Sequence, residues 1–133
     1  MEIVGVGIDV CAVERVRKLL DGESGARWLE RIFTPAERAR MDARFPVASA
    51  LQKKRFAAHV AGLYAAKEAI GKATGKGVMG AGRLSWQEIE IAHTEDGAPY
   101  VIILHEQWRQ YRFDISISHD SGIAVAVAIC GHT

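Results

Sequence analysis

Three charged residues of this chain have the types and spacing that phosphate chemistry requires. Glu68 and Lys72 are four residues apart in the segment YAAKEAIGKATGKG, so a helix would place them on one face. Asp9 directly follows the apolar segment VGVGI. Two carboxylates from separate elements can hold Mg²⁺ on a phosphate ligand, because phosphate oxygens and water complete the octahedral shell. Simpler interpretations remain open: an exposed ion pair between Glu68 and Lys72, and a catalytic acid or a helix N-cap at Asp9.

Two further features could contact a phosphate group. Backbone amides of the GKATGKG segment, around Gly75 and Gly77 with Lys76 between them, could hold phosphate oxygens. The segment follows a helix and lacks the phosphate-loop spacing, so a helix stop and a loop explain it equally well. His119 ends the SISH segment and could be a ligand or a capping hydrogen-bond donor.

Helices are expected mainly in the first 75 residues. A strand is predicted over residues 2–8, and its glycines suggest that something approaches its backbone closely. Residues 12–32 indicate a helix, broken near Asp21 and Gly22. The FTPAE segment predicts a helix that begins after Thr34 and runs to about Arg44, because it offers an N-cap, a proline and a capping-box acid. A long alanine-rich helix is expected from about 49 to 74.

The last third alternates apolar and polar residues as strands do. WQEIEIA, PYVIILH, FDISIS and GIAVAVAIC are separated by turn signals, with a short helical piece around 106–111. Short turns between consecutive strands predict antiparallel pairing. Both faces of the last strand are apolar, so both should be covered. The fold class expected is α+β, with helices packed on an antiparallel sheet that the first strand joins, in a single domain spanning 1–133.

Composition and charge exclude several classes of protein. The chain has 133 residues, 49% of them hydrophobic, and its apolar runs fall short of the roughly 20 residues of a membrane span. Its start does not resemble a secretory signal, and two cysteines are too few for a disulfide framework, so a cytoplasmic location is expected. The net charge of +1 argues against a nucleic-acid binder. Residues 15–55 nevertheless hold eleven Lys/Arg against five Asp/Glu, which suits an acidic partner or simply a solvated helical face.

Taken together and in order, the motifs resemble a known family. GIDVCAVERV, FTPAE, YAAKEAIGKATGKG, WQEIEI and SISHDSGIAVAVAI are similar to segments of the holo-[acyl-carrier-protein] synthases, the short, single-domain 4′-phosphopantetheinyl transferases. The resemblance covers about residues 4–129. It implies transfer of the 4′-phosphopantetheine arm of coenzyme A to a serine of apo acyl carrier protein, with release of adenosine 3′,5′-bisphosphate. It also implies a role in fatty acid biosynthesis, a homotrimer, and active sites between subunits, to which Asp9 and Glu68 could come from different chains.

The resemblance also implies roles for particular residues. Asp9 and Glu68 match metal ligands, with Mg²⁺ as the cofactor, and Lys72 matches the catalytic lysine. Glu68, directly or through metal-bound water, is the expected base for the serine hydroxyl, and Lys72 would stabilise the leaving group or protonate it. Positions that bind coenzyme A in the family match Lys72, His119 and the stretch Gly75, Lys76 and Gly77. Arg15 matches an arginine that faces the carrier protein, and its neighbours Arg17 and Arg27 could steer the acidic carrier.

Two positions depart from the family pattern. The helix commonly reads RFAAKEA where this chain reads LYAAKEA, so Leu63 replaces a basic residue. Lys76 stands where a threonine is usual. Alternatives are the same transfer to a carrier domain of a polyketide or peptide synthetase, and a catalytically silent protein that binds coenzyme A or serves assembly. Neither nucleic acid nor a membrane is expected as a partner.

Overall fold

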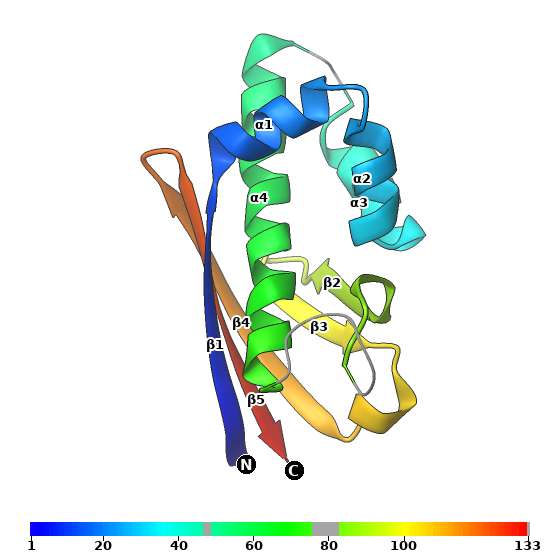
Figure 1. The fold of residues 1–133 in the computed structure, drawn as a ribbon, viewed down its shortest axis with the longest axis vertical. Helices are drawn as coiled ribbons and strands as arrows, with labels where there is room; N and C mark the ends of the chain where they lie inside the picture. Colours follow the sequence, from blue (N-terminus) through cyan, green and yellow to red (C-terminus); the bar gives the residue numbers. More distant parts are fainter. Residues whose placement is uncertain (47–48, 76–82, 133) are drawn as a thin grey trace.

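Helices and antiparallel strands make up the protein, as the sequence predicts (Figure 1). The computed structural model describes residues 1–46, 49–75 and 83–132. Within these residues, the elements follow in the order β1 (Glu2–Ala12), α1 (Val13–Asp21), α2 (Gly25–Ile32), α3 (Pro35–Arg44), α4 (Ala50–Ala73), η1 (Trp86–Glu88), β2 (Ile89–His93), β3 (Pro99–Ile103), η2 (Glu106–Trp108), β4 (Tyr111–Asp120) and β5 (Ile123–His132). The α+β class is therefore confirmed.

The main sheet joins the two ends of the chain. Its strand order is β1-β5-β4, and both pairings are antiparallel. Between β4 and β5, Ser121 and Gly122 have φ values of 51° and 79°, which is the backbone of the tight turn that suits twisted hairpins. The register places Asp9 opposite Ala126 and His119 opposite Ala124.

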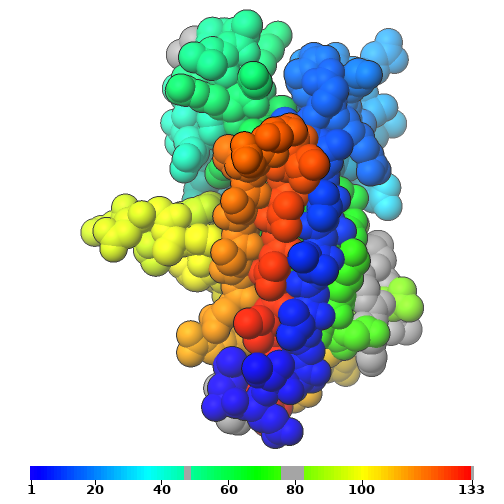
Figure 2. Space-filling view, turned by 90° about the vertical axis from the view of Figure 1, so that its left-hand side faces the viewer, coloured from blue at the N-terminus to red at the C-terminus, as the bar shows by residue number. Residues whose placement is uncertain are grey.

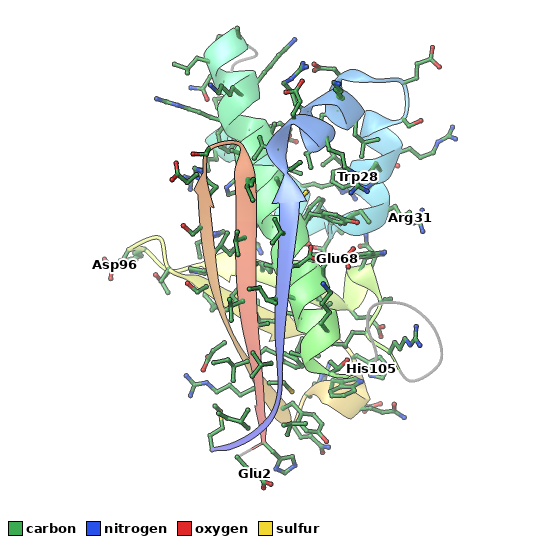
Figure 3. All side chains as sticks on the ribbon, turned by 60° about the vertical axis from the view of Figure 1, so that its left-hand side comes forward. Glu2, Trp28, Arg31, Glu68, Asp96 and His105 are labelled. Atoms are coloured by element: carbon green, nitrogen blue, oxygen red, sulfur yellow. The ribbon has the colours of Figure 1, made fainter. Side chains whose placement is uncertain are left out.

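The expectation of one sheet was wrong, because β2 and β3 form a separate two-stranded sheet. This hairpin projects away from the main sheet, and Asp96 lies at its tip (Figure 3). The short helix η2 interrupts the chain between β3 and β4, so these strands are not joined as a hairpin. Alternation in a sequence identifies a strand but leaves its partner open, since pairing depends on tertiary packing.

The long helix α4 packs on one face of the main sheet, across β1 and β5 (Figure 1). Close approach is possible because β1 presents Gly5 and Gly7 to the helix. A methyl group built on either glycine would overlap a backbone carbonyl oxygen of α4, that of Ala73 or Ala69. The predicted close contact at the glycines is confirmed.

Local signals fix where the helices begin. The Thr34 hydroxyl accepts a hydrogen bond from the Glu37 amide, and the Glu37 carboxylate accepts one from the Thr34 amide, which completes the predicted capping box of α3. Helix α4 begins after Ser49, close to the prediction. The N-cap interpretation of Asp9 was wrong, because β1 continues past residue 8 and Ala12 caps α1.

A buried ion pair holds the helices to the small sheet. The side chains of Lys67 and Glu37 are 0% and 1% exposed, and Lys67 Nζ lies 2.5 Å from Glu37 Oε1. Lys67 also donates to the carbonyl oxygens of Ile32 and Trp86, at 2.8 Å and 3.0 Å. Glu37 Oε2 accepts from the Ile91 amide at 2.9 Å. Together with the Thr34 amide, which donates to Glu37 Oε1, these hydrogen bonds satisfy the buried charges, so removing one member of the ion pair would leave the other unpaired.

The outer face of β1 and β5 is uncovered in the single chain (Figure 2), and its side chains are apolar. The expectation that both faces of β5 are covered was therefore wrong for one copy: the inner face is buried under α4, whereas the outer face is open. Exposed fractions on β1 reach 62% at Val6 and 58% at Val10. A contiguous apolar patch of this kind is typical of an interaction surface. The residues that form it are Val4, Val6, Ile8, Val10, Ile123, Val125, Val127 and Ile129.

Candidate active site

The candidate site lies where α4 crosses β1. Asp9 shares the helix-facing side of β1 with Gly7, because side chains alternate along a strand. Lys72, near the end of α4, donates to Asp9 Oδ1 at 2.9 Å and to the Ile8 carbonyl oxygen at 3.0 Å. The Lys72 side chain is half exposed and that of Asp9 is 17% exposed, so solvent and ligands can reach the pair.

Glu68 lies one turn before Lys72 and faces the same region. Both Asp9 and Glu68 raise the pKa of the Cys11 thiol, in addition to burial, which is the larger cause; the charge of Arg15 lowers it. Within a single chain, the structure thus pairs Asp9 with Lys72 and places Glu68 one turn before Lys72 on the same helix.

The donor chemistry of this site fits a divalent cation. Asp9 and Glu68 are carboxylates, the oxygen donors that Mg²⁺ prefers, and Mg²⁺ ordinarily takes only one or two of them from a protein. Among the residues that the structure describes, no group of three or more His, Cys, Asp or Glu could hold a metal ion. A cation at Asp9 and Glu68 would thus need ligands from outside the chain, such as phosphate oxygens and water.

His119 lies elsewhere, in a groove of about 1180 Å³. Neither Asp9, Glu68 nor Lys72 lines this groove. It opens beside α4 near the β4–β5 turn, whereas Lys72 reaches β1. Its cationic and imidazole-bearing residues are Arg44, Lys54, Arg55, His59, His93 and His119.

The other charged groups of the groove act on His59. Burial, the largest cause, lowers the pKa of His59 to about 4, and the charges of Arg44, His93 and His119 lower it further. The rings of His59 and His93 lie 6.0 Å apart between centroids. Burial also lowers the pKa of His93, as do Arg44 and Arg40. The groove is nevertheless suitable for an anion, because its arginine and lysine side chains outnumber the one carboxylate of its lining, that of Asp120.

The other predicted positions have mixed outcomes. Gly75 follows α4 with a φ of 81°, the left-handed conformation that ends many helices, so the predicted stop is confirmed there. Lys76 and Gly77 lie outside the described residues. Arg15 and Arg27 are exposed. Arg17 is paired with Glu14 at 2.6 Å and Asp21 at 2.8 Å, so much of its charge is balanced within α1.

Sequence reasoning overlooked the histidine-lined groove. His59 and His93 come from α4 and β2, and no spacing in the sequence indicates that they meet. They meet only because α4 and β2 lie side by side in the folded chain.

Comparison with sequences of known proteins agrees with the predicted family. The sequence model of the 4′-phosphopantetheinyl transferase superfamily matches residues 5–128. The holo-[acyl-carrier-protein] synthase of Caldanaerobacter subterraneus subsp. tengcongensis is 38% identical over 135 residues, which cover 97% of this chain and 94% of that protein. The enzyme of the same name from Chlorobium chlorochromatii is 40% identical over 126 residues, covering 93% of this chain and 97% of the relative.

Solved structures show the same fold. A holo-(acyl-carrier-protein) synthase from Bacillus anthracis in complex with CoA (3′,5′-ADP) superposes with a TM-score of 0.80 at 32% identity, and all of both chains is covered. The Helicobacter pylori synthase in complex with coenzyme A gives 0.76 at 28% identity, covering 95% of this chain and 99% of that chain. None of the helices in the described part of this chain is long and apolar enough to cross a membrane.

Proposed function

The chain belongs to the 4′-phosphopantetheinyl transferase superfamily, and from this premise we propose that it transfers the 4′-phosphopantetheine arm of coenzyme A to a serine of apo acyl carrier protein. The serine oxygen forms a bond to phosphorus. The bond between that phosphorus and the bridging oxygen of the diphosphate breaks, and adenosine 3′,5′-bisphosphate leaves. The observation that supports this proposal is the ion pair of Lys72 with Asp9 at the crossing of α4 and β1, with Glu68 one turn before Lys72 on the same helix.

Asp9 and Glu68 are the residues that would hold Mg²⁺. When bound, the ion would polarise the phosphoryl group under attack and neutralise charge on the leaving phosphate. Phosphoryl transfer depends mostly on positioning and electrostatic stabilisation, which suits a site with few reactive side chains.

Two side chains of the site would handle protons and charge. Glu68 is placed to accept the proton of the serine hydroxyl, which is a weak nucleophile at neutral pH. Lys72 holds Asp9 in the structure and presents an ammonium group that would stabilise the leaving phosphate.

The separation of the groove of His119 from the carboxylates of Asp9 and Glu68 supports an active site shared between subunits. Coenzyme A carries phosphate groups at both ends of its nucleotide part, and the groove of His119 suits one of them. That groove and the carboxylates do not line a common cavity in one chain. A neighbouring copy could offer its groove to the carboxylates if the apolar sheet faces packed together. We therefore assign the uncovered face of β1 and β5 to a homotrimer interface.

The carrier protein would approach over α1 and α2. Arg15 is exposed on α1, and Arg27 is exposed on the neighbouring helix α2. Acyl carrier proteins are acidic, so these side chains would steer docking, and Arg17 would add less because Glu14 and Asp21 pair with it. The physiological role would be activation of the carrier for fatty acid biosynthesis in the cytoplasm.

A mass measurement tests this function. The protein is incubated with apo acyl carrier protein, coenzyme A and Mg²⁺, and the carrier is weighed. The expected result is a mass gain of one phosphopantetheine group, which is lost in Asp9→Ala and Glu68→Ala while both variants keep a folded circular-dichroism spectrum. Near wild-type turnover by Glu68→Ala would contradict the assignment. Parallel assays with apo carriers of polyketide and peptide synthetases identify the preferred substrate, and no mass gain on any carrier would favour a silent coenzyme-A-binding protein.

A further inference from the structure

Lys72 donates both to the side chain of Asp9 and to the backbone beside it. Its Nζ lies 2.9 Å from Asp9 Oδ1 and 3.0 Å from the Ile8 carbonyl oxygen. These acceptors come from adjacent residues of β1, so together they hold the ammonium group against the strand. The Asp9 side chain is only 17% exposed, which strengthens its attraction to a charged partner. The ammonium group of Lys72 is therefore the cation that the Asp9 carboxylate holds in this conformation.

A divalent cation at Asp9 would meet this ammonium group. The two positive charges would share one carboxylate, and at such short separations they repel each other. Of the two negative charges that Asp9 and Glu68 offer, the ammonium group balances one. In the parts of the chain that the structure describes, no group of three or more His, Cys, Asp or Glu could hold a metal ion. The protein alone thus offers a divalent cation little net negative charge.

The Lys72 side chain is able to leave Asp9 for another anion. It is 51% exposed, and its ammonium group sits on a flexible four-carbon stem. The diphosphate of coenzyme A would attract the ammonium group and the divalent cation alike. Its negative charge would draw Lys72 from the carboxylate and would also supply the oxygen ligands that Mg²⁺ ordinarily takes from phosphate.

We propose that Lys72 makes binding of the divalent cation dependent on coenzyme A. This inference rests on the proposed function. Without coenzyme A, the ammonium group neutralises Asp9 and repels a second cation. When the diphosphate binds, it attracts the ammonium group, and the Asp9 carboxylate becomes available to the ion. The ion and coenzyme A then bind cooperatively, and each raises the affinity of the protein for the other by the same factor.

The test uses Lys72→Met, which removes the positive charge and keeps a long, unbranched side chain. Mn²⁺ binding to the full chain is measured with and without coenzyme A from the free-ion signal in electron paramagnetic resonance. Chelation of Mn²⁺ by coenzyme A itself is measured in a protein-free sample and subtracted. Without coenzyme A, we expect Lys72→Met to bind Mn²⁺ about tenfold more tightly than the wild type. Coenzyme A should tighten Mn²⁺ binding about tenfold or more in the wild type, and much less in Lys72→Met.

Two further variants separate the charge at residue 72 from the charge of the whole chain. Lys72→Arg keeps the charge, so its Mn²⁺ affinity should stay close to that of the wild type. Lys53→Met removes the same charge from an exposed position in the first turn of α4 and should also bind Mn²⁺ as the wild type does. Because Lys72 is half exposed, its replacement should leave the thermal midpoint without metal near that of the wild type.

The outcomes distinguish this inference from the proposed function. Equal or weaker Mn²⁺ binding by Lys72→Met without coenzyme A overturns the inference, because a lysine that only orients Asp9 for the ion would give that result. An unchanged effect of coenzyme A on Mn²⁺ binding in Lys72→Met overturns it as well. If the wild type modifies the carrier, the proposed function survives either result. A wild type that neither binds Mn²⁺ with coenzyme A nor modifies any carrier overturns both.

Discussion

Lys72 Nζ lies 2.9 Å from Asp9 Oδ1 and so connects α4 to the middle of β1. Helical spacing alone would pair Lys72 with Glu68, one turn earlier. The ammonium group instead holds the carboxylate of another element. The lysine thus orders one candidate metal ligand and keeps a positive charge where a phosphate would leave.

Replacing Lys72 should affect turnover far more than stability. The ion pair is half exposed, and such pairs contribute at most about 1 kcal/mol. Loss of a charge aimed at a developing anion typically costs about 10²- to 10³-fold in kcat. We expect Lys72→Ala to show that loss in a carrier-modification assay, with an unfolding midpoint near that of the wild type. Lys72→Arg keeps the charge and should recover part of the activity; equal turnover in all three proteins would contradict the role of the lysine.

The contact of Gly7 with α4 predicts a strong effect on stability. A methyl group at residue 7 would overlap the Ala69 carbonyl oxygen, and only movement of the helix away from the strand could relieve this overlap. Gly7→Ala should lower the free energy of unfolding by about 3 kcal/mol or more. Gly22→Ala is the control, because a methyl group there makes contacts of 3.5 Å and 3.6 Å. Urea unfolding at one fixed protein concentration compares the variants, and equal midpoints would rule out the close contact.

Lys67→Met should destabilise the protein by about 3–5 kcal/mol, since it leaves Glu37 charged and buried. Burial lowers the pKa of Lys67, and the Glu37 carboxylate counters this effect. The double variant Lys67→Met/Glu37→Gln should cost less than the sum of its parts, because the unpaired charge is gone. Chemical denaturation measures the coupling. Strict additivity of the two substitutions would show that the ion pair is energetically unimportant.

Salt should slow association with an acidic carrier. If Arg15 and Arg27 steer docking, the association rate should fall about tenfold or more as ionic strength rises from low salt to above physiological values. Arg27→Glu should lower the low-salt rate and flatten the salt dependence. Arg109→Glu is the control, because Arg109 is exposed on the segment after η2. Its association rate and salt dependence should match those of the wild type. Stopped-flow mixing provides the rates, and a salt-insensitive wild type would remove steering from the mechanism.

Much of this fold could be predicted from local signals, because the residues that interact in them are close in sequence. Thr34 and Glu37 cap each other, and the alanine-rich segment before Gly75 is one long helix. The close approach at Gly5 and Gly7 also followed from residue type, since little else permits a backbone to lie so near a helix. Such features could be predicted without any knowledge of tertiary structure.

Features that depend on distant partners were missed. The two-sheet arrangement, the pairing of Lys72 with Asp9 and the meeting of His59 with His93 all join elements far apart in the chain. Lys67 shows the same limit: it precedes Glu68 in the sequence, yet its partner Glu37 lies 30 residues away. The resemblance identified Asp9 and Glu68 as candidate ligands of one metal ion. Where each lies in the fold could be learned only from the structure.

The depressed pKa of His59 predicts a pH dependence of stability. The folded protein holds this imidazole neutral down to about pH 4, whereas the unfolded chain takes up the proton near the ordinary histidine pKa of 6.5. The contribution is fully present above about pH 6.5 and is lost as the pH falls towards 4, because only the unfolded state binds the proton in that window. His59→Phe keeps a ring against Phe45, whose centroid lies 5.3 Å from that of His59, and removes the titrating group. Between pH 6.5 and 4, the wild type should therefore lose about 1–2 kcal/mol more stability than His59→Phe, a figure reduced for partial solvent exposure. Carboxylates that titrate in the same range cancel in the difference between the two proteins, so parallel stability curves from urea unfolding would show that His59 is not held neutral by burial and by Arg44.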